Sequence, residues 1–326
     1  MNNNFGKHFN ITFYGGSHTE SLGVIICGVP QGLQLTEADF TADIDRRRAG
    51  AKGTTPRRER DVPHIVSGVE EGVTTGDKLE IVFYNENTRS GDYDRLRVHP
   101  RPSHADLTAR HKYGEKFDLR GGGIFSGRMT LLFVAAGVVA KKILRGATFS
   151  SRIVEIGGCR DAEQFETIVA TAQREGDSVG GVVECTVTGA GRDLGEPFFD
   201  SVESTASHLL FAVPAVKGVE FGSGFEGVRL RGSERNDLII DSLGTTATNN
   251  EGGINGGITN GNPVVVRVAI KPTPSIGRGQ QTYNFESQRV EELNIGGRHD
   301  ACIVLRAAVV VEAVMAIALA ELKLSL

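Results

Sequence analysis

The chain lacks several features that would place it in a specialised class of protein. It contains no tryptophan and only four cysteines in 326 residues. The cysteines have none of the CxxC spacings that metal or redox sites use, so we expect reduced core thiols. They are Cys27, Cys159, Cys185 and Cys302. The N-terminus has neither the basic start nor the apolar run of a signal peptide, which makes the cytoplasm the expected location.

A strong charge imbalance and a membrane-spanning run are also missing. The formal net charge of -4 argues against a general nucleic-acid binder, so any anion site must be local. The two most apolar segments are residues 131–144 and 303–322. The first is too short to span a bilayer, and the second contains Arg306 and Glu312. Because both are apolar around most of their circumference, they predict two helices buried on several sides.

Glycine is plentiful, and it is most concentrated near residue 255. Five glycines lie within residues 252–261, followed by a β-branched run at 264–270 and a Lys-Pro-Thr-Pro-Ser turn. Glycine lets a backbone approach a ligand closely, and proline stiffens a loop. The stretch therefore predicts a rigid cradle for a flat or anionic ligand. A glycine-rich hairpin connection without a ligand is the alternative.

A basic run at residues 46–60 is the second candidate for a functional site. Seven of its fifteen residues are lysine or arginine. A solvated charged face would account for such a run. Guanidinium groups also match phosphate and carboxylate geometry, so the alternative is a loop that binds a small anionic molecule.

Three histidines lie in loops built of glycine, serine, proline and arginine. They are His18, His104 and His299. An imidazole can hold or give a proton near neutral pH, and a proton donor beside an anion site would assist the departure of a phosphate. None of the three has the i, i+4 spacing of a metal site, and no G-x-S-x-G elbow is present, so zinc and serine hydrolases are disfavoured.

The remaining pattern predicts one domain of mixed α and β structure over residues 1–326. Strands are expected at 11–14, 22–28, 64–67, 79–85 and 181–188, and helices at 36–48, 161–174 and 203–211. Residues 222–227 match G-x-G-x-x-G, but an alternating strand pattern follows at 228–232. We therefore discount a dinucleotide fingerprint, which needs a helix at that point.

Several long segments together resemble the chorismate synthase family. They are GGSHTESLG, DIDRRRAG, SGVEEGVTTGD, RPSHADLTARHKYG, VAAGVVAKK, PAVKGVEFGSGF, GGINGGITNGNPVVVRVAIKPTPSI and RHDACIVLRAAVVVEA. They occur in the family's order, and the similarity runs from about Gly15 to Glu321. The combination is far more specific than any single glycine-rich loop.

The resemblance implies a lyase of the shikimate pathway. Members convert 5-enolpyruvylshikimate 3-phosphate to chorismate and phosphate by a 1,4-anti elimination that requires reduced FMN without net redox change. The implied fold is α+β, a β-α-β sandwich whose helices lie between antiparallel sheets in a pseudo-twofold repeat. A homotetramer is implied, with a small-molecule substrate, no metal, and NADPH as a candidate reductant.

Family roles can be carried onto matching positions. The catalytic set implied is His18 as proton donor to the phosphate, His104 beside the reduced flavin, and Ser17, Asp300 and Ser126 around the C6 proton. Substrate anions would contact Arg47, Arg48, Arg128 and Arg298, with Arg47 also where members bind NADP. The FMN cradle would comprise Ser126, Ala215, Gly256, Lys271, Pro272, Thr273, Pro274, Ser275 and Arg298.

The chain departs from the family pattern near the expected flavin site. Gly16 and Thr19 replace the usual glutamate and glycine, and Ile124 and Phe125 stand where an arginine and a serine are usual. Because Ser126 and Arg128 remain, we predict activity with altered flavin affinity. The alternatives are an inactive or repurposed relative that still binds FMN, and a non-catalytic anion-binding module.

Overall fold

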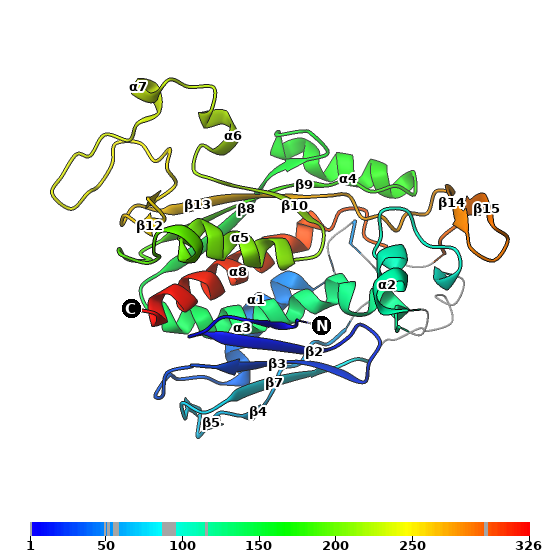
Figure 1. Ribbon diagram of the computed structural model, residues 1–326, viewed down its shortest axis with the longest axis horizontal. Helices are drawn as coiled ribbons and strands as arrows, with labels where there is room; N and C mark the ends of the chain where they lie inside the picture. Colours follow the sequence, from blue (N-terminus) through cyan, green and yellow to red (C-terminus); the bar gives the residue numbers. More distant parts are fainter. Residues whose placement is uncertain are drawn as a thin grey trace.

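Two antiparallel sheets enclose a layer of helices, as Figure 1 shows for the computed structural model. The structure describes residues 2–48, 50, 53–54, 59–86, 96–114, 117–296 and 299–326. The predicted α+β class, with helices layered between antiparallel sheets, is confirmed.

The first sheet is built from the N-terminal part of the chain. Its strand order is β1 (Asn4–Phe5), β2 (Asn10–Gly15), β3 (Ser21–Cys27), β7 (Leu79–Tyr84) and β4 (His64–Ser67), and the short pair β5 (Val69–Glu70) and β6 (Val73–Thr74) lies beside it. Tyr14 pairs with Gly23, and a Cβ at Gly23 would lie 2.3 Å from the Tyr14 ring. A larger residue at this position of β3 would displace the Tyr14 ring.

The second sheet comes from the C-terminal part. Its order is β10 (Val216–Phe221), β13 (Val264–Ile270), β9 (Gly181–Thr188) and β8 (Thr148–Ile156). In β13 every second side chain is buried, from Val264 to Ile270. This alternation is what a sheet with one face on the core requires.

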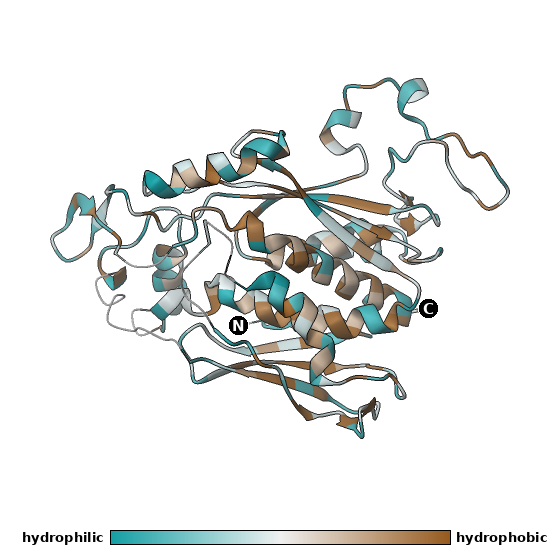
Figure 2. Ribbon diagram, turned by 180° about the vertical axis from the view of Figure 1, so that it is seen from behind, coloured by the Kyte–Doolittle hydropathy of each residue, from teal (hydrophilic) through white to brown (hydrophobic). Residues whose placement is uncertain are grey.

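The helices between the sheets form the centre of the molecule. They are α1 (Thr41–Arg47), which follows the 3-10 turn η1 (Glu37–Phe40), α3 (Thr130–Ile143), α5 (Val202–Ala212) and α8 (Val304–Leu324). Figure 2 shows apolar residues concentrated in these helices and in the adjoining strands. The long helices α3 and α8 are the two buried helices that the sequence predicts, one from each half of the chain.

Small side chains let α3 and α8 approach closely. Gly137 of α3 lies against Ala313 of α8, where an added Cβ would be 2.4 Å from the Ala313 Cβ. A single cluster of buried hydrophobic residues includes both helices and the inner faces of both sheets. The expectation of one domain stays a prediction.

Other elements lie at the edges of this sandwich. Helix α4 (Phe165–Arg174), preceded by η5 (Ala162–Gln164), covers the outer face of the second sheet, and α2 (Asp106–Tyr113) lies at one end near β14 (Gln280–Asn284) and β15 (Arg289–Leu293). An arm carrying α6 (Gly224–Gly227) and α7 (Gly232–Arg235) projects from the opposite end. The remaining short elements are η3 (Arg120–Phe125), η4 (Gly127–Met129), η6 (Phe198–Asp200), β11 (Ile254–Asn255) and β12 (Ile258–Thr259).

One secondary-structure prediction is wrong. Residues 228–231 form a turn and a bend that lead into α7, because this segment belongs to the arm and no described strand lies beside it to pair with. The helix that accompanies the G-x-G-x-x-G match, α6, has only four residues. Over the part of the chain described here, no helix is both long and apolar enough to cross a membrane.

A buried carboxylate ties the helix layer together. Glu312 of α8 accepts hydrogen bonds from Arg46 Nη1 at 2.7 Å and Nη2 at 2.6 Å, and from Ser151 at 2.5 Å; its side chain is 2 % exposed. Lys141 of α3 lies 3.4 Å away. Burial alone would raise the pKa of Glu312, but the hydrogen bonds from Arg46 and Ser151 lower it below its usual range.

We predict that Glu312→Gln lowers the free energy of unfolding by about 3 kcal/mol at pH 7, because it leaves two cations without their buried partner. Because the pKa of Glu312 is lower in the folded state, its carboxylate contributes fully to the free energy of unfolding above the pKa of the unfolded state. This contribution is lost as the pH falls through the pKa of the folded state. Urea denaturation at pH 7 and pH 4 measures this. An equal stability deficit at both pH values would contradict the assignment.

Candidate active site

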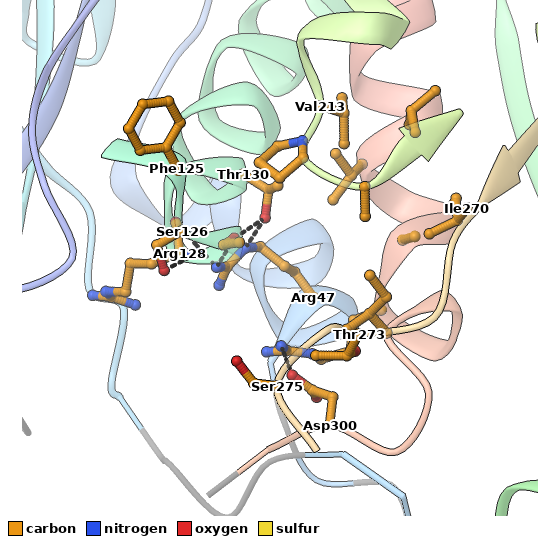
Figure 3. Close-up of a pocket in the computed structure, with 18 of the residues that line it drawn as sticks. Arg47, Phe125, Ser126, Arg128, Thr130, Val213, Ile270, Thr273, Ser275 and Asp300 are labelled. Carbon is orange, nitrogen blue, oxygen red and sulfur yellow. Dashed lines mark hydrogen bonds and ion pairs between the residues drawn. The ribbon is translucent and has the colours of Figure 1, made fainter. Parts of the chain in front are cut away.

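A cavity of about 1240 Å³ opens beside the first turns of α3 and α8. Its wall includes Ser126, Arg128 and Thr130 before and at the start of α3, and Asp300 and Ile303 before α8. Helix N-termini carry unsatisfied N–H groups and a partial positive charge, which favours anionic ligands. Figure 3 shows side chains from both helix starts and from the loop after β13 around one space.

Arg47, at the end of α1, is almost completely buried in one wall. Its guanidinium donates to Thr130 Oγ1 at 3.0 Å, to Asp61 at 3.2 Å, and to the carbonyls of Gly127 at 3.3 Å and Arg128 at 3.2 Å. Burial lowers its pKa to about 9, although the Asp61 carboxylate opposes the shift. Arg47 is thus charged at neutral pH, and much of its hydrogen-bonding capacity is used by the protein (Figure 3).

Arg128 connects the cavity wall to the N-terminal sheet. Its Nη1 donates to Asp61 at 2.5 Å and its Nε to Asn85 Oδ1 at 2.8 Å. Asn85 in turn donates to the carbonyls of Gly16 and Thr19, at 3.1 and 2.6 Å. The guanidinium is therefore linked to the turn that carries Ser17 and His18.

Three glycines explain how that turn can lie against the cavity. Gly121 lines the cavity, and a Cβ there would be 2.1 Å from the His18 ring and 2.7 Å from Ser17 Oγ. Gly121, Gly122 and Gly123 all have positive φ, and the Gly123 carbonyl accepts from the Ser17 N–H at 3.2 Å. Ser17 and His18 lie directly behind the cavity wall, in contact with it through Gly121.

His104 belongs to a buried charged cluster on another side of the cavity. Its Nδ1 is 2.8 Å from Asp106, whose side chain is 1 % exposed. Arg101 donates to Asp106 from Nε at 2.8 Å and Nη2 at 2.7 Å, and its Nη1 donates to Ser275 at 3.0 Å. Burial alone would raise the pKa of Asp106, but the hydrogen bonds from Arg101 and His104 lower it far below its usual range. The carboxylate is ionised and orients the His104 ring.

The loop after β13 forms the adjoining wall. The Lys271 N–H donates to the carbonyl of Ala215 at 3.0 Å, and Lys271 Nζ donates to the carbonyl of Ser103 at 2.7 Å. Burial, followed by the nearby charge of Lys217, lowers the pKa of Lys271. The hydroxyl of Thr273 is buried and has no hydrogen-bond partner among the residues described here. A polar ligand could satisfy it.

Asp300 and His299 complete this side. Asp300 accepts from Arg306 at 2.8 Å, one turn into α8 (Figure 3). Burial, and then the charge of Arg101, lower the pKa of His299, which favours its neutral form. An apolar section of wall, with Val213 and Ile270, faces these polar groups.

The structure brings most of the predicted residues to one cavity. Those that line it are Arg47, Arg48, His104, Ser126, Arg128, Ala215, Lys271, Thr273, Pro274, Ser275 and Asp300. Pro272 is in the same loop but outside the lining. Arg298 lies outside the described residues. Among the described residues, no group of three or more His, Cys, Asp or Glu side chains is placed to hold a metal ion.

Gly256 requires a correction. It is exposed in the turn between β11 and β12, and the neighbouring Gly257 accepts from the Val202 N–H at the start of α5. The cavity lies at the other end of this 11-residue helix, about 16 Å away by helical rise. Within one chain, Gly256 is not part of the cavity wall.

The glycines around Gly256 have a packing role instead. A Cβ at Gly252 would be 2.4 Å from the backbone of Gly222, and one at Gly253 would be 2.4 Å from the Pro263 carbonyl. These residues let the hairpin pack on neighbouring backbone, as the alternative without a ligand proposed. Most of the Lys-Pro-Thr-Pro-Ser turn lines the cavity and these glycines do not, so a cradle for a ligand stays a prediction for the turn alone.

Sequence reasoning missed three residues that organise the cavity. Asp61, Arg101 and Asp106 are each less than 9 % exposed and each bonds a predicted site residue. Asp61 has a φ of 49°, which is uncommon for a residue with a Cβ. Asp106 lies two positions after His104, and this spacing is the one feature of the sequence that could have indicated its contact with the histidine.

Comparisons with known proteins agree with this geometry. The family model for chorismate synthase matches residues 9–324. A protein of Chitinophaga pinensis named chorismate synthase is 55 % identical over 324 residues, covering 99 % of this chain and 96 % of that one. One of Dehalococcoides mccartyi (strain BAV1), with the same name, is 44 % identical and covers 99 % and 97 % of the two chains.

A solved structure supports the same assignment. A crystal structure titled as chorismate synthase superposes with a TM-score of 0.77 at 28 % sequence identity, and the match covers 98 % of this chain and 93 % of the other. The chain belongs to the chorismate synthase family of lyases.

Proposed function

We propose that this enzyme converts 5-enolpyruvylshikimate 3-phosphate to chorismate and phosphate, with reduced FMN bound beside the substrate in the cavity. The reaction is a 1,4-anti elimination that removes the C6 proton and breaks the C3–O bond. It is the last common step of the shikimate pathway, which leads to the aromatic amino acids.

The residues present fit a flavin mononucleotide. The cavity combines an apolar section, with Val213 and Ile270, and a polar section that includes Lys271 and Thr273, whose Oγ1 has no partner among the described residues. An isoalloxazine ring needs the first, and a phosphate needs donors such as the second. Ser126, Ala215 and the residues from Lys271 to Ser275 would hold the cofactor. When bound, it supplies electron density that weakens the C3–O bond.

The side chains of this chain would then bind anions and move protons. Arg48, Arg128 and Arg298 would hold the substrate's phosphate and carboxylates. His18 would give its proton to the departing phosphate, whose charge grows as the ester bond breaks. Ser17 and Asp300, assisted by Ser126, would help to take the C6 proton.

His104 has a separate task in this proposal. The Asp106 carboxylate, held by Arg101, lies 2.8 Å from His104 Nδ1 and would fix the orientation of the ring at the cavity wall. From this position His104 would protonate the reduced cofactor or stabilise negative charge on it. NADPH as the source of that reduction stays a prediction. The burial of Arg47 gives no support to a direct NADP contact.

One observation supports the proposal most directly. In a member of this family, a single cavity is lined by Arg128, His104, Thr273 and Asp300. The direct test is an anaerobic assay with 5-enolpyruvylshikimate 3-phosphate, FMN and dithionite, in which chorismate is followed by its absorbance. We expect chorismate to form. FMN binding without chorismate would favour an inactive relative, and absence of both would leave an anion-binding module.

We predict that His104→Ala lowers turnover by more than an order of magnitude, about the effect of losing a general acid. His111, exposed on α2, provides the control, and His111→Ala should retain the turnover of the unmodified enzyme. The same anaerobic assay measures both variants. Near-normal turnover of His104→Ala would reject the role.

We also propose a cytoplasmic homotetramer. All four cysteines are free thiols, as a reducing compartment favours. The arm described above exposes Leu238, Ile239, Ile240 and Leu243, each at least 58 % accessible. Exposed apolar groups of this kind commonly mark contacts between subunits.

We predict that the double change Leu238→Asp and Ile239→Asp shifts the protein to smaller species, because a buried interface cannot accept unpaired charges. Sedimentation velocity measures the change, with Val290→Asp, exposed on β15, as the control. An unchanged tetramer in the double variant would show that the arm is not an interface, and a monomeric unmodified protein would reject the tetramer.

A further inference from the structure

Asp61 occupies an unusual position among the charged groups of the cavity. Its side chain is 3 % exposed, and its two oxygens accept from different arginines. Oδ1 is 2.5 Å from Arg128 Nη1, and Oδ2 is 3.2 Å from Arg47 Nη1. Its backbone adopts the left-handed region, with φ 49°. A residue with a Cβ persists there only where the surrounding structure holds it.

The two arginines differ in what they leave for a ligand. Arg47 also donates to Thr130 and to two carbonyls, so most of its donors bind protein. Arg128 is held at two nitrogens, by Asp61 at Nη1 and by Asn85 at Nε. Its third nitrogen, Nη2, has no hydrogen-bond partner in the part of the chain that the structure describes. The contacts therefore fix the plane of the Arg128 guanidinium and leave one edge for an anion.

The same contacts couple Arg128 to the turn of the proposed proton donor. Asn85 accepts from Arg128 and donates to the carbonyls of Gly16 and Thr19. A rotation of the guanidinium would break the bond to Asn85 and loosen this turn. Rigid placement of binding groups within a fraction of an ångström matters for affinity and for rate.

We propose that Asp61 is a positioning residue that holds Arg128 for recognition of the substrate's anionic group, with Arg47 as a buried counter-cation. The proposal rests on the proposed function for the identity of the substrate. It assigns Asp61 no contact with the reacting atoms. Its ligand class is a phosphorylated or carboxylated small molecule.

A purely structural role is the alternative, since any buried carboxylate between two cations can stabilise a fold. Glu312 is the matched control. It is equally buried, accepts from Arg46, lies near Lys141, and is not among the residues that line the cavity. Loss of charge at Glu312 should lower stability without affecting the ligand.

The test compares Asp61→Asn with Glu312→Gln in the full-length, FMN-loaded protein. Calorimetry with oxidised FMN measures binding of 5-enolpyruvylshikimate 3-phosphate and, separately, of inorganic phosphate, without turnover. Asparagine keeps one acceptor but turns an N–H toward the other guanidinium. We expect Asp61→Asn to weaken both ligands by about tenfold, the order of one lost charge-assisted hydrogen bond.

The controls separate positioning from stability. Glu312→Gln should bind both ligands with affinities within about twofold of those of the unmodified protein. In Asp61→Asn the affinity for FMN should likewise change by no more than about twofold, which is well below the effect of one lost hydrogen bond. In steady-state assays Asp61→Asn should raise KM for the substrate, and Asp61→Glu should restore part of the loss. Unchanged ligand affinity in Asp61→Asn, or equal weakening in Glu312→Gln, overturns the proposal.

Two further outcomes keep the test decisive. If Asp61→Asn does not fold, Asp61→Glu keeps the charge but displaces the carboxylate by one methylene, and unchanged binding in that variant overturns the proposal. If the unmodified protein binds inorganic phosphate but not the named substrate, the proposed function fails while the role of Asp61 is still tested. Binding of neither ligand refutes both.

Discussion

The close packing of α3 on α8 is the contact on which the rest of the structure depends. Gly137 and Ala313 meet where no larger side chain could fit. Because each helix comes from a different half of the chain, their contact brings the loops before them to the same place. Ser126 and Arg128 precede one helix and Asp300 precedes the other, so the cavity exists because these two helices begin side by side.

Charge within the cavity is arranged in two buried clusters. In one, Asp61 lies between Arg47 and Arg128, and in the other Asp106 lies between Arg101 and His104. Each carboxylate offsets part of the cost of burying cations and fixes their direction. The wall between the clusters can then offer donors to a ligand, as Thr273 Oγ1 and Arg128 Nη2 do.

Much of the fold could be predicted from local pattern, and the exceptions have physical causes. Strand β13 alternates buried and partly buried residues, and α3 and α8 are apolar nearly all round, so their positions followed from periodicity. Helix α2 was missed because its sequence, DLTARHKY, is mostly polar and carries no apolar stripe. The strand expected at 228–232 failed because alternation cannot reveal whether a partner strand exists.

Site residues could be predicted where residue type and sequence motif indicate a chemical role. They were missed where the role depends on burial in the fold. His104, Arg128 and Lys271 stood out by type and setting. Asp61 lies at the end of a charged run whose pattern predicts exposure, and only the fold reveals that it is buried between arginines. Gly256 lies away from the cavity, and the sequence could not show this because a glycine that permits close packing and one that admits a ligand look alike.

The central claim is that one cavity holds substrate and cofactor together. Arg128 Nη2 would bind an anionic group of the substrate, and the turn after β13 would bind FMN. A crystal structure of the enzyme with FMN and 5-enolpyruvylshikimate 3-phosphate tests it most directly. We predict that the isoalloxazine ring lies against the residues from Lys271 to Ser275 and that an anionic group of the substrate lies on Arg128. Either ligand bound outside this cavity would contradict it.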